Sequence, residues 1–262
     1  MEHMGYLSTL GQADPATEAS QTQIITYIPP EPLDIDTLPP RILIEEAPNL
    51  LAAGSNVGLR TWEASLHLAT YLHAHPDLIH NKDIIELGAG TGLVSLLCAG
   101  PLRAKSVLST DGLPHVVESM EKNFYRNRQT LLSGDHEHNT LVAQVLDWGD
   151  LENLEDTLEI SGQMPNYSLI LGADITYSPD VVPVLAELLK VLMVDMFPEN
   201  GMEALISATV RNEMTLRVFR ESCAERGLLL EDVKFECPSV MEQKGFFHEQ
   251  AFPIIIMRIK RA

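Results

Sequence analysis

The sequence predicts an α/β domain in which a seven-stranded, mostly parallel sheet carries helices on both faces and ends in an antiparallel C-terminal strand. Five short apolar segments alternate with helical patterns between residues 83 and 227, which is the order of a parallel sheet covered on both faces. The last two apolar segments have no helix between them, so they can form an antiparallel hairpin at one edge. A glycine-rich turn after the first of the five segments completes the pattern of a doubly wound sheet.

The period of the apolar residues places each predicted element. Strands of the main sheet are expected at residues 83–89, 106–111, 138–148, 167–174, 203–210, 228–237 and 252–260, and a further short strand at 41–46. Helices are expected at residues 62–75, 93–100, 114–128, 178–196 and 212–227. Right-handed crossovers should connect the parallel strands.

Four residues set the expected helix ends. Thr61 is a good N-cap for the first helix, and Pro76 ends that helix. Pro183 falls in the first turns of the fourth helix, where a proline is tolerated. Gly227 closes the last helix.

Residues 1–40 differ from the rest of the chain. They show little periodicity and are rich in proline, threonine, serine and acidic residues, as in "YIPPEPLDIDTLPP". Such a composition supplies too little apolar surface for a packed core. We therefore expect an extended or disordered N-terminal arm over residues 1–40 and a single domain over residues 41–262.

The chain is strongly acidic. Its 18 basic and 37 acidic residues give a net charge of −19 and a pI near 4.7. A field of this sign repels phosphate backbones and anionic membrane surfaces, so we expect no nucleic-acid partner and no membrane partner. It attracts basic surfaces, which favours a lysine-rich protein partner, although solubility alone explains the same charge. We expect the chain to be a monomer.

The three cysteines, Cys98, Cys223 and Cys237, lie far apart and outside any spacing typical of a zinc site. An odd number of scattered cysteines favours a reducing compartment. His136 and His138 fit an exposed loop best, so no metal site is expected. No apolar run approaches the roughly 18 residues of a membrane span and no signal pattern opens the chain, which favours a soluble, cytoplasmic protein.

The strongest motif is the turn Glu86-Leu-Gly88-Ala-Gly90-Thr-Gly92, which joins the first strand of the parallel set to its helix. Glycines in this position let the backbone take positive φ and approach a ligand closely, as in Rossmann-like sheets. Leu93 stands where the dinucleotide fingerprint G-x-G-x-x-G requires a glycine. No Walker loop is present, which disfavours ATP.

Two further strand ends carry residues suited to a nucleoside. Asp111, 19 residues after Gly92, has a carboxylate that can accept both hydroxyls of a ribose. Asp147 and Trp148 end the third strand of the parallel set, where the indole can pack on a purine and the carboxylate can accept from its amino group. The alternatives are a helix N-cap role for Asp111 and ordinary core packing for Trp148.

These motifs together resemble a class I S-adenosyl-L-methionine-dependent methyltransferase, with its E-x-G-x-G-x-G turn, ribose-type acid, Asp-Trp pair and reversed last strand. Within that class the chain is similar to the seven-strand protein-lysine methyltransferases, in "GLRTWEASLHLATYL" (58–72) and in the Asp-x-x-Tyr of "ADITY". The stretches "TWEASLHLA", "LDW", "ADITYSPD" and "ATVRN" (208–212) most resemble the eukaryotic elongation factor 2 lysine methyltransferases. The resemblance covers residues 41–262.

The resemblance implies S-adenosyl-L-methionine as the cofactor and N-methylation of a protein lysine, with elongation factor 2 as the expected substrate. It implies that Trp62 helps to enclose the cofactor, that Glu86 lies near its amino group and that Asp111 holds its ribose. Plain core packing is the alternative for Trp62.

The stretch "YSLILGADITYSPD" ends a buried strand in Ala173 and Asp174, with Tyr177 close behind. By the same resemblance this strand end faces the methyl group, with Ala173 beside the cofactor. Asp174 can accept a hydrogen of the attacking amine and stabilise the charge that reappears on nitrogen, and Tyr177 can form a wall or donate a hydrogen bond. The alternatives are a helix cap for Asp174, although Ser178 suits that task better, and ordinary packing for Tyr177.

Other assignments stay open. Arg211 and Asn212 follow the fifth strand of the parallel set and contact a substrate protein in one interpretation, whereas Asn212 caps a helix in the other. Ile175 and Thr176 stand where DNA and RNA amino-methyltransferases carry two prolines, which fits a slender alkyl amine better than a flat base. A small-molecule N- or O-methyltransferase and a non-catalytic partner-binding module of the same fold are the alternative functions.

Overall fold

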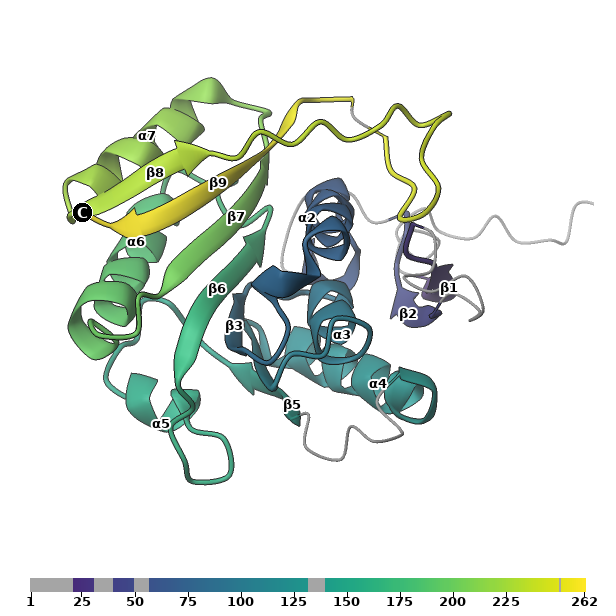
Figure 1. Ribbon diagram of the computed structural model, residues 1–262, viewed down its shortest axis with the longest axis horizontal. Helices are drawn as coiled ribbons and strands as arrows, with labels where there is room; N and C mark the ends of the chain where they lie inside the picture. Colours follow the sequence, from purple (N-terminus) through teal and green to yellow (C-terminus); the bar gives the residue numbers. More distant parts are fainter. Residues whose placement is uncertain (1–20, 31–39, 50–56, 132–139, 250) are drawn as a thin grey trace, which may run out of the picture.

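The computed structural model describes residues 21–30, 40–49, 57–131, 140–249 and 251–262. The main sheet comprises β3 (Asp83–Leu87), β4 (Ser106–Asp111), β5 (Thr140–Val145), β6 (Tyr167–Ala173), β7 (Glu203–Thr209), β8 (Leu228–Asp232) and β9 (Ile254–Arg261). Their order is β5-β4-β3-β6-β7-β9-β8, with parallel pairing from β5 to β7 and antiparallel pairing of β9 with β7 and β8 (Figure 1). β9 thus runs against the other strands of this sheet, and the predicted fold class is confirmed.

Helices cover both faces of the sheet (Figure 1). One face carries α2 (Glu63–Ala74), α3 (Leu93–Ala99) and α4 (Pro114–Leu131), and the other carries α5 (Leu154–Leu158), α6 (Val182–Lys190) and α7 (Glu213–Ala224). α6 continues into a π-helical turn, Val191–Met196, and short 3-10 turns at Val57–Leu59 and Pro76–Leu78 flank α2. Among the described helices, none has both the length and the apolar character needed to cross a bilayer.

The alternation of side chains along β3 explains the two helix layers. Ile84 belongs to the apolar cluster under α2, α3 and α4, whereas Ile85 and Leu87 belong to the cluster under α5, α6 and α7. Every residue of β3 is buried, because the strand lies at the centre of the sheet with helices on both sides. The chain leaves β3 toward β4 and β5 and then returns to β6 on the other side of β3. Such a reversal marks the point where ligands bind at the carboxyl ends of the strands.

Helix α2 begins one residue later than the predicted N-cap implies. Its N-cap position is Trp62, and its first residue is Glu63. The hydroxyl of Thr61 is shared with the hydroxyl of Thr91 at 2.8 Å, so it is not available to cap the helix. The sequence prediction was wrong here because a distant partner competes for a good capping residue.

Helix α6 also begins later than predicted, at Val182 rather than Ser178. The backbone N–H groups of Val181 and Val182 both donate to the carbonyl of Ser178, so a separate turn precedes the helix. Ser178 is therefore not the N-cap, whereas Pro183 lies in the first turn as predicted.

The strand predicted at residues 228–237 is shorter in the structure. β8 ends at Asp232, and residues 233–249, hereafter the C-terminal loop, leave the sheet before the chain returns as β9. This loop reaches the N-terminal segment (Figure 1), where the N–H of Phe246 donates to the carbonyl of Ile28 at 2.9 Å. Apolar alternation continues through "VKFEC", which is why the sequence alone extends the strand.

A two-stranded sheet precedes the main one. β1 (Gln23–Tyr27) pairs antiparallel with β2 (Ile42–Glu46), and Tyr27 packs against the apolar cluster under α2 and α3. The sequence predicts β2 but not β1, which falls in the expected arm. The backbone of residues 23–27 is extended, as expected for the arm, but it is hydrogen-bonded to β2, so these residues belong to the folded unit. The rest of the expected arm, apart from residues 21–30 and 40, lies outside the described residues.

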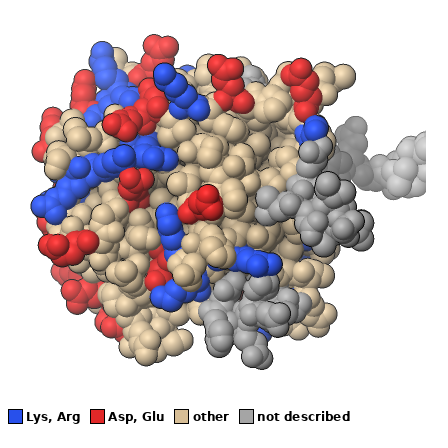
Figure 2. Space-filling view, in the orientation of Figure 1, with Lys and Arg blue, Asp and Glu red and all other residues tan. Residues whose placement is uncertain are grey.

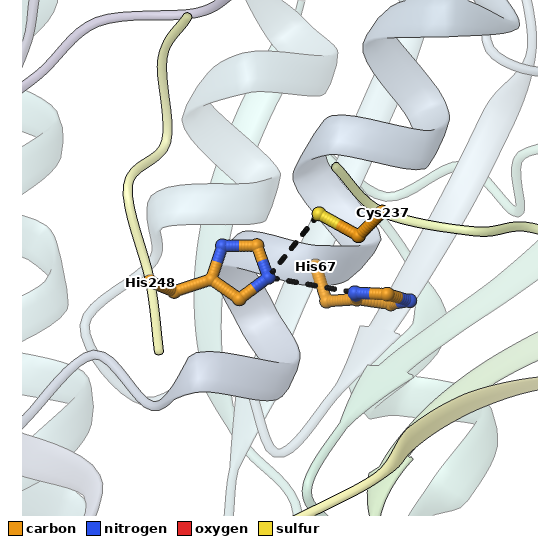
Figure 3. A group of neighbouring side chains, drawn as sticks. All are labelled: His67, Cys237 and His248. Atoms are coloured by element: carbon orange, nitrogen blue, oxygen red, sulfur yellow. Dashed lines mark hydrogen bonds between the residues drawn. The ribbon is translucent and has the colours of Figure 1, made fainter. Parts of the chain in front are cut away.

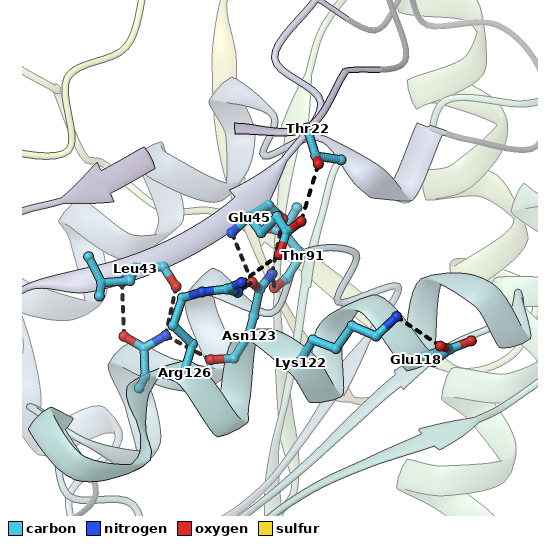
Figure 4. A network of polar contacts seen from close by, with 9 residues as sticks. Thr22, Leu43, Glu45, Thr91, Glu118, Lys122, Asn123 and Arg126 are labelled. Atoms are coloured by element: carbon cyan, nitrogen blue, oxygen red, sulfur yellow. Dashed lines mark hydrogen bonds and ion pairs between the residues drawn. The ribbon is translucent and has the colours of Figure 1, made fainter. Parts of the chain in front are cut away.

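Two buried asparagines, Asn123 and Asn127, lie one helical turn apart on α4 and hold β2 in place. Figure 4 shows Asn123 beside Glu45 and Thr91. The side-chain oxygen of Asn123 accepts the N–H of Glu45 at 2.8 Å, and its amide donates back to the carbonyl of Glu45 at 3.3 Å. Asn127 makes the same pair of bonds with Leu43, at 2.9 Å and 2.7 Å. Asn123 also donates to the carbonyl of Thr91 at 3.0 Å, so one helix ties β2 to the glycine turn.

The substitution Asn123→Ala should lower the free energy of unfolding by about 2–4 kcal/mol, because it leaves buried backbone groups of Glu45 and Thr91 without partners. Chemical denaturation monitored by circular dichroism measures this change. Lys122→Ala is the matched control on the same helix, since it removes only the exposed ion pair with Glu118, which contributes little to stability. Equal effects of the two substitutions would contradict the role given to Asn123.

Candidate functional site

A cavity of about 700 Å³ opens at the carboxyl ends of the parallel strands. Residues at or after the ends of β3, β4, β5, β6 and β7 contribute to its lining, together with residues around the start of α2. The volume is in the range of small-molecule sites. The lining includes Trp62, Gly88, Gly90, Asp111, Asp147, Trp148, Ala173, Asp174, Tyr177 and Arg211. The structure therefore brings most of the predicted site residues together, but Glu86 and Gly92 are not part of the lining.

The turn between β3 and α3 enters the left-handed region three times, at Gly88, Gly90 and Gly92, with φ of 62°, 54° and 82°. Residues with a β-carbon avoid this region, so each position favours glycine. A β-carbon on Gly90 would also lie 3.2 Å from the carbonyl oxygen of Gly58. Gly92 has a different task from the other two, because it is the N-cap of α3 and packs closely on Phe124.

Ile175, in the loop after β6, packs against the ends of β3 and β6. Its side chain is buried against two glycines. A β-carbon added to Gly88 would lie 2.6 Å from Cγ2 of Ile175, and one added to Gly172 would lie 2.4 Å from Cδ1 of Ile175. Glycine at both positions thus makes room for one isoleucine. In the sequence, Ile175 is notable only as a replacement for proline, and the one sign of its packing is a glycine inside an apolar strand.

Asp111 ends β4 and shapes the floor of the cavity. One carboxylate oxygen accepts the N–H of Gly90 at 3.2 Å, and the other accepts the N–H of Leu113 at 3.2 Å just before α4 begins. Burial raises the pKa of this carboxyl, while these N–H groups oppose the rise. Asp111 lies three residues before Pro114, the first residue of α4, so it is not the N-cap of that helix. Its bond with Leu113 closes a local turn instead, and each oxygen keeps a lone pair for a ribose hydroxyl.

Glu86 lies beneath the glycine turn and not in the cavity. It is 2% exposed and accepts a hydrogen bond from the hydroxyl of Ser95, which accepts one from Ser109. Burial raises the pKa of Glu86 to about 8, and the hydrogen bond from Ser95 opposes that rise. The expected contact between Glu86 and a cofactor amino group is not supported by this position. The sequence motif predicts an acidic residue at position 86. It does not predict which face of the sheet the carboxylate points to, because that depends on the alternation of side chains along β3.

The end of β5 contributes an exposed acid and a half-buried indole. Asp147 accepts the N–H of Gly149 at 2.9 Å, which fixes the local turn. Trp148 packs against the cluster under α5 and α6, and its ring lies 3.5 Å from the position of a β-carbon on Gly88. Its Nε1 is buried and has no hydrogen-bond partner among the described residues. Trp148 therefore combines the predicted core packing with a place in the cavity wall.

Trp62 closes the cavity at the start of α2. Its Nε1 donates to the carbonyl of Val57 at 2.8 Å, which fixes the ring. The guanidinium carbons of Arg60 and Arg211 lie 4.5 Å and 5.7 Å from the centre of the ring, both within reach of a cation–π interaction. Trp62 is half-buried and borders open space, so core packing alone does not describe it.

Asp174 lies at the cavity edge with its carboxylate turned toward the end of β7. Its Oδ1 accepts the N–H of Thr209 at 2.9 Å, and its Oδ2 accepts the Thr209 hydroxyl at 3.1 Å and two N–H groups of Arg211 at 3.2 Å. Its φ is 56°, a left-handed conformation that aspartate adopts more readily than most residues. α6 begins at Val182 with Val181 at its N-cap position, so Asp174 does not cap that helix. A side chain only 10% exposed thus binds a cation beside the cavity.

Of the remaining predicted residues, one lines the cavity and the other caps a helix. Tyr177 is 61% exposed and lines the mouth of the cavity, so it is not a core residue. Asn212 is the N-cap of α7, where its side chain accepts the N–H of Met214 at 2.9 Å, as its alternative role predicts. Sequence reasoning missed Thr209, and its place at a strand end two residues before Arg211 is the one signal that could have found it.

The cavity fits the cofactor that the motifs indicate. Gly88 and Gly90 line the cavity and have no side chains, so a ligand can lie against their backbone. Asp111 offers acceptors for ribose hydroxyls, and Asp147 and Trp148 offer an acceptor and an aromatic face for an adenine. These residues together suit S-adenosyl-L-methionine, without a contribution from Glu86.

The fold and the cavity define a class: the S-adenosyl-L-methionine-dependent methyltransferases built on a seven-stranded sheet. Residues 50–220 match a family model described as "Lysine methyltransferase". The match covers more than half of the chain, and the chain belongs to this lysine methyltransferase family.

Several curated proteins are similar to the chain. "Protein-lysine N-methyltransferase EFM3" of Chaetomium thermophilum is 36% identical over 223 residues, which are 85% of this chain and 63% of the relative. The EFM3 protein of Saccharomyces cerevisiae is 32% identical over 72% of this chain and 55% of the relative. "Protein-lysine N-methyltransferase EEF2KMT" of Homo sapiens is 24% identical over 83% of this chain and 63% of the relative. The chain therefore spans about three fifths of the length of the curated relatives it matches.

Solved structures show a looser likeness. A S-adenosylmethionine-dependent methyltransferase from Clostridium acetobutylicum superposes with a TM-score of 0.47 at 12% identity, over 77% of this chain and 92% of that one. TrmK of M. capricolum, solved with S-adenosyl-homocysteine, has a TM-score of 0.43 at 13% identity, over 73% and 67%. The fold assignment rests on the order and direction of the strands.

The packing of Ile175 can be tested with a pair of substitutions. Gly172→Ala should lower the free energy of unfolding by about 1–3 kcal/mol, because its β-carbon overlaps Cδ1 of Ile175. Ile175→Val deletes that atom, so the double variant should be about 1 kcal/mol more stable than the sum of the single effects. Gly88→Ala is the control. Ile175→Val should not rescue it, because valine keeps the Cγ2 atom that overlaps the new β-carbon and because φ at residue 88 stays positive. Rescue of both glycine variants, or of neither, would contradict this packing.

Burial of Glu86 predicts a pH dependence of stability. Because its pKa is higher in the folded state than in the unfolded state, its favourable contribution is complete below about pH 4.5 and is lost as pH rises to about 8. Glu86→Gln should therefore gain roughly 3–5 kcal/mol relative to the native chain between pH 5 and pH 8.5. Urea titrations at both pH values measure this difference. The exposed residue Glu121 provides the control, and Glu121→Gln should track the native chain at both pH values.

Proposed function

We propose that this chain uses S-adenosyl-L-methionine to N-methylate a lysine side chain of a protein. One observation carries the proposal: the carboxylate of Asp174 binds a cation at the edge of the cavity that contains the glycine turn and Asp111. Membership of the lysine methyltransferase family supports the same conclusion.

The cofactor would be held by residues of four strand ends and of α2. Asp111 would bind the ribose, Asp147 and Trp148 would bind the adenine, and Trp62 and Ala173 would enclose the rest. When bound, S-adenosyl-L-methionine supplies a methyl group made electrophilic by positive sulfur. The protein then needs to position an amine in line with that methyl group.

A lysine amine must lose a proton before it can attack. With a reference pKa near 10.4, this deprotonation costs about 4–5 kcal/mol at pH 7. Oδ1 of Asp174 keeps a lone pair beyond its bond with Thr209, so it can accept an amine hydrogen and orient the nitrogen lone pair. The same carboxylate stabilises the positive charge that returns to nitrogen. The released proton leaves to solvent at the open mouth beside Tyr177.

Arg211 acts on substrate binding in two ways. Its guanidinium lies on Oδ2 of Asp174 and near the face of Trp62, and its positive charge there favours the neutral form of a neighbouring lysine amine. Together with Thr209 it also fixes the direction of the carboxylate, so Arg211 acts as a positioning residue. Charge-assisted hydrogen bonds of this kind hold a carboxylate more firmly than neutral ones.

We propose elongation factor 2 in the cytoplasm as the substrate, on the strength of the motifs around Trp62 and Arg211. Elongation factor 1A is the natural comparison, because the relative named "EEF1A lysine methyltransferase 3" of Xenopus tropicalis is 33% identical over 53% of this chain. The net charge of −19 favours a basic partner. Basic side chains near α7 and the C-terminal strands are interspersed with acidic ones (Figure 2), and several are paired, as in Arg226–Glu187.

Methyl transfer to purified proteins tests the proposal. The native chain is incubated with cofactor labelled in the methyl group and with elongation factor 2 or elongation factor 1A. We expect label on a lysine of elongation factor 2, and a rate reduced about 100-fold or more in Asp174→Asn, which keeps the shape of the side chain and removes its charge.

Asp180→Asn is the matched control, because Asp180 is another carboxylate of the cavity lining but is exposed. It should keep a rate within about threefold of the native chain. Calorimetric titration should show that Asp174→Asn still binds the cofactor while Asp111→Asn binds it weakly. Label on elongation factor 1A alone would show that elongation factor 2 is not the substrate. Label confined to small molecules or RNA would contradict the proposed protein-lysine methylation.

A further inference from the structure

A cluster of three metal-ligand side chains lies away from the cavity, between α2 and the C-terminal loop. His67 comes from α2, and Cys237 and His248 come from the loop (Figure 3). Nδ1 or Nε2 of each histidine and Sγ of the cysteine all lie within 4.8 Å of one another. Both histidines are buried, with 2% and 5% exposure, and Cys237 is partly exposed.

Two of the three spacings within the cluster match those of ligands around one ion, and the third, between His67 and Cys237, is at most 4.8 Å. Nε2 of His248 lies 3.4 Å from Nδ1 of His67 and 3.7 Å from Sγ of Cys237. Tetrahedral zinc, with Zn–N of about 2.05 Å and Zn–S of about 2.3 Å, separates two nitrogen ligands by about 3.4 Å and nitrogen from sulfur by about 3.6 Å. An N–H···N hydrogen bond would bring the two nitrogens closer, to about 3.0 Å.

The surroundings of His248 direct its free nitrogen into the cluster. Its Nδ1 lies 2.7 Å from the carbonyl oxygen of Phe246, which can only accept, so Nδ1 carries the proton and Nε2 presents a lone pair. A backbone carbonyl on the outer nitrogen is typical of metal-binding histidines. Gln243 fixes the same segment, since its Oε1 accepts the N–H of His248 at 2.9 Å and its Nε2 donates to Cys237 Sγ at 3.9 Å.

Hydrogen bonding alone does not satisfy His67. A neutral His67 ring carries one proton, on either Nδ1 or Nε2. A proton on Nδ1 leaves Nε2 as a buried acceptor, and Nε2 has no partner among the described residues. A proton on Nε2 instead leaves two lone pairs facing each other, on His67 and His248. A cation between these nitrogens removes that repulsion.

We propose that His67, Cys237 and His248 bind a Zn²⁺ ion, with water in the fourth position on the partly exposed side of Cys237. Thiolate and imidazole ligands suit this ion, and cysteine deprotonates on binding it. The ion pins the C-terminal loop to α2, the helix whose N-cap is Trp62. Sequence analysis predicted no metal site because His67 and His248 are 181 residues apart, far from any local ligand spacing.

Cobalt is the probe ion for this site. Co²⁺ added to the metal-free chain of residues 1–262 should give one equivalent of a thiolate-to-cobalt absorption band, which added Zn²⁺ abolishes. Cys237→Ser should lose the band, whereas Cys223→Ala, which removes a buried thiol outside the cluster, should keep it. Absence of the band from the native chain, or its survival in Cys237→Ser, would overturn the proposal.

Two measurements on the native chain cover the case in which Cys237→Ser does not fold. Cys98 and Cys223 are buried, so brief alkylation should modify Cys237, and Zn²⁺ should protect it in peptide mass spectra. Saturating Zn²⁺ should also raise the Tm by about 5–10 °C, and the exposed-residue variant His80→Ala should respond equally. Unprotected Cys237 together with an unchanged Tm would show that the cluster is packing alone.

Discussion

The left-handed turn between β3 and α3 is the constraint on which the rest of the site depends. Because Gly88 and Gly90 have no side chains, the turn is tight enough for the N–H of Gly90 to reach Asp111 and for Ile175 to pack beneath Gly88. The ends of β3, β4 and β6 are thereby joined around one cavity. Ala89 adds a further link, since its N–H donates to the carbonyl of Thr110 at 2.8 Å. A larger residue in the turn would separate three strand ends at once.

The end of β6 shows a second constraint of the same kind. Asp174 occupies a backbone region that is uncommon for a residue with a β-carbon, and four hydrogen bonds from Thr209 and Arg211 hold it there. Strain of this sort persists where the surrounding contacts determine the conformation, and it is concentrated at functional sites. Here it places a carboxylate beside the cavity without using the helix that follows, which begins only at Val182.

The sequence predicts the sheet well because each strand and helix carries its own apolar period, and the site residues follow from their places at strand ends. What escapes prediction depends on contacts between distant residues. Strand β1 is recognisable only when Tyr27 is seen to pack on the core and to donate to Glu46 at 2.7 Å. Thr61 loses its capping role to a partner 30 residues away. Glu86 belongs to the right motif but points toward Ser95, because the face of a strand is fixed by its register.

A structure of the chain crystallised with S-adenosyl-L-homocysteine, the product of methyl transfer, tests the central claim most directly. The account predicts that the ribose hydroxyls lie within hydrogen-bond distance of Asp111 and that the adenine lies on Trp148. It also predicts that the sulfur faces the mouth where Asp174 and Tyr177 lie. A ligand bound elsewhere, or one whose sulfur faces away from Asp174, would contradict it.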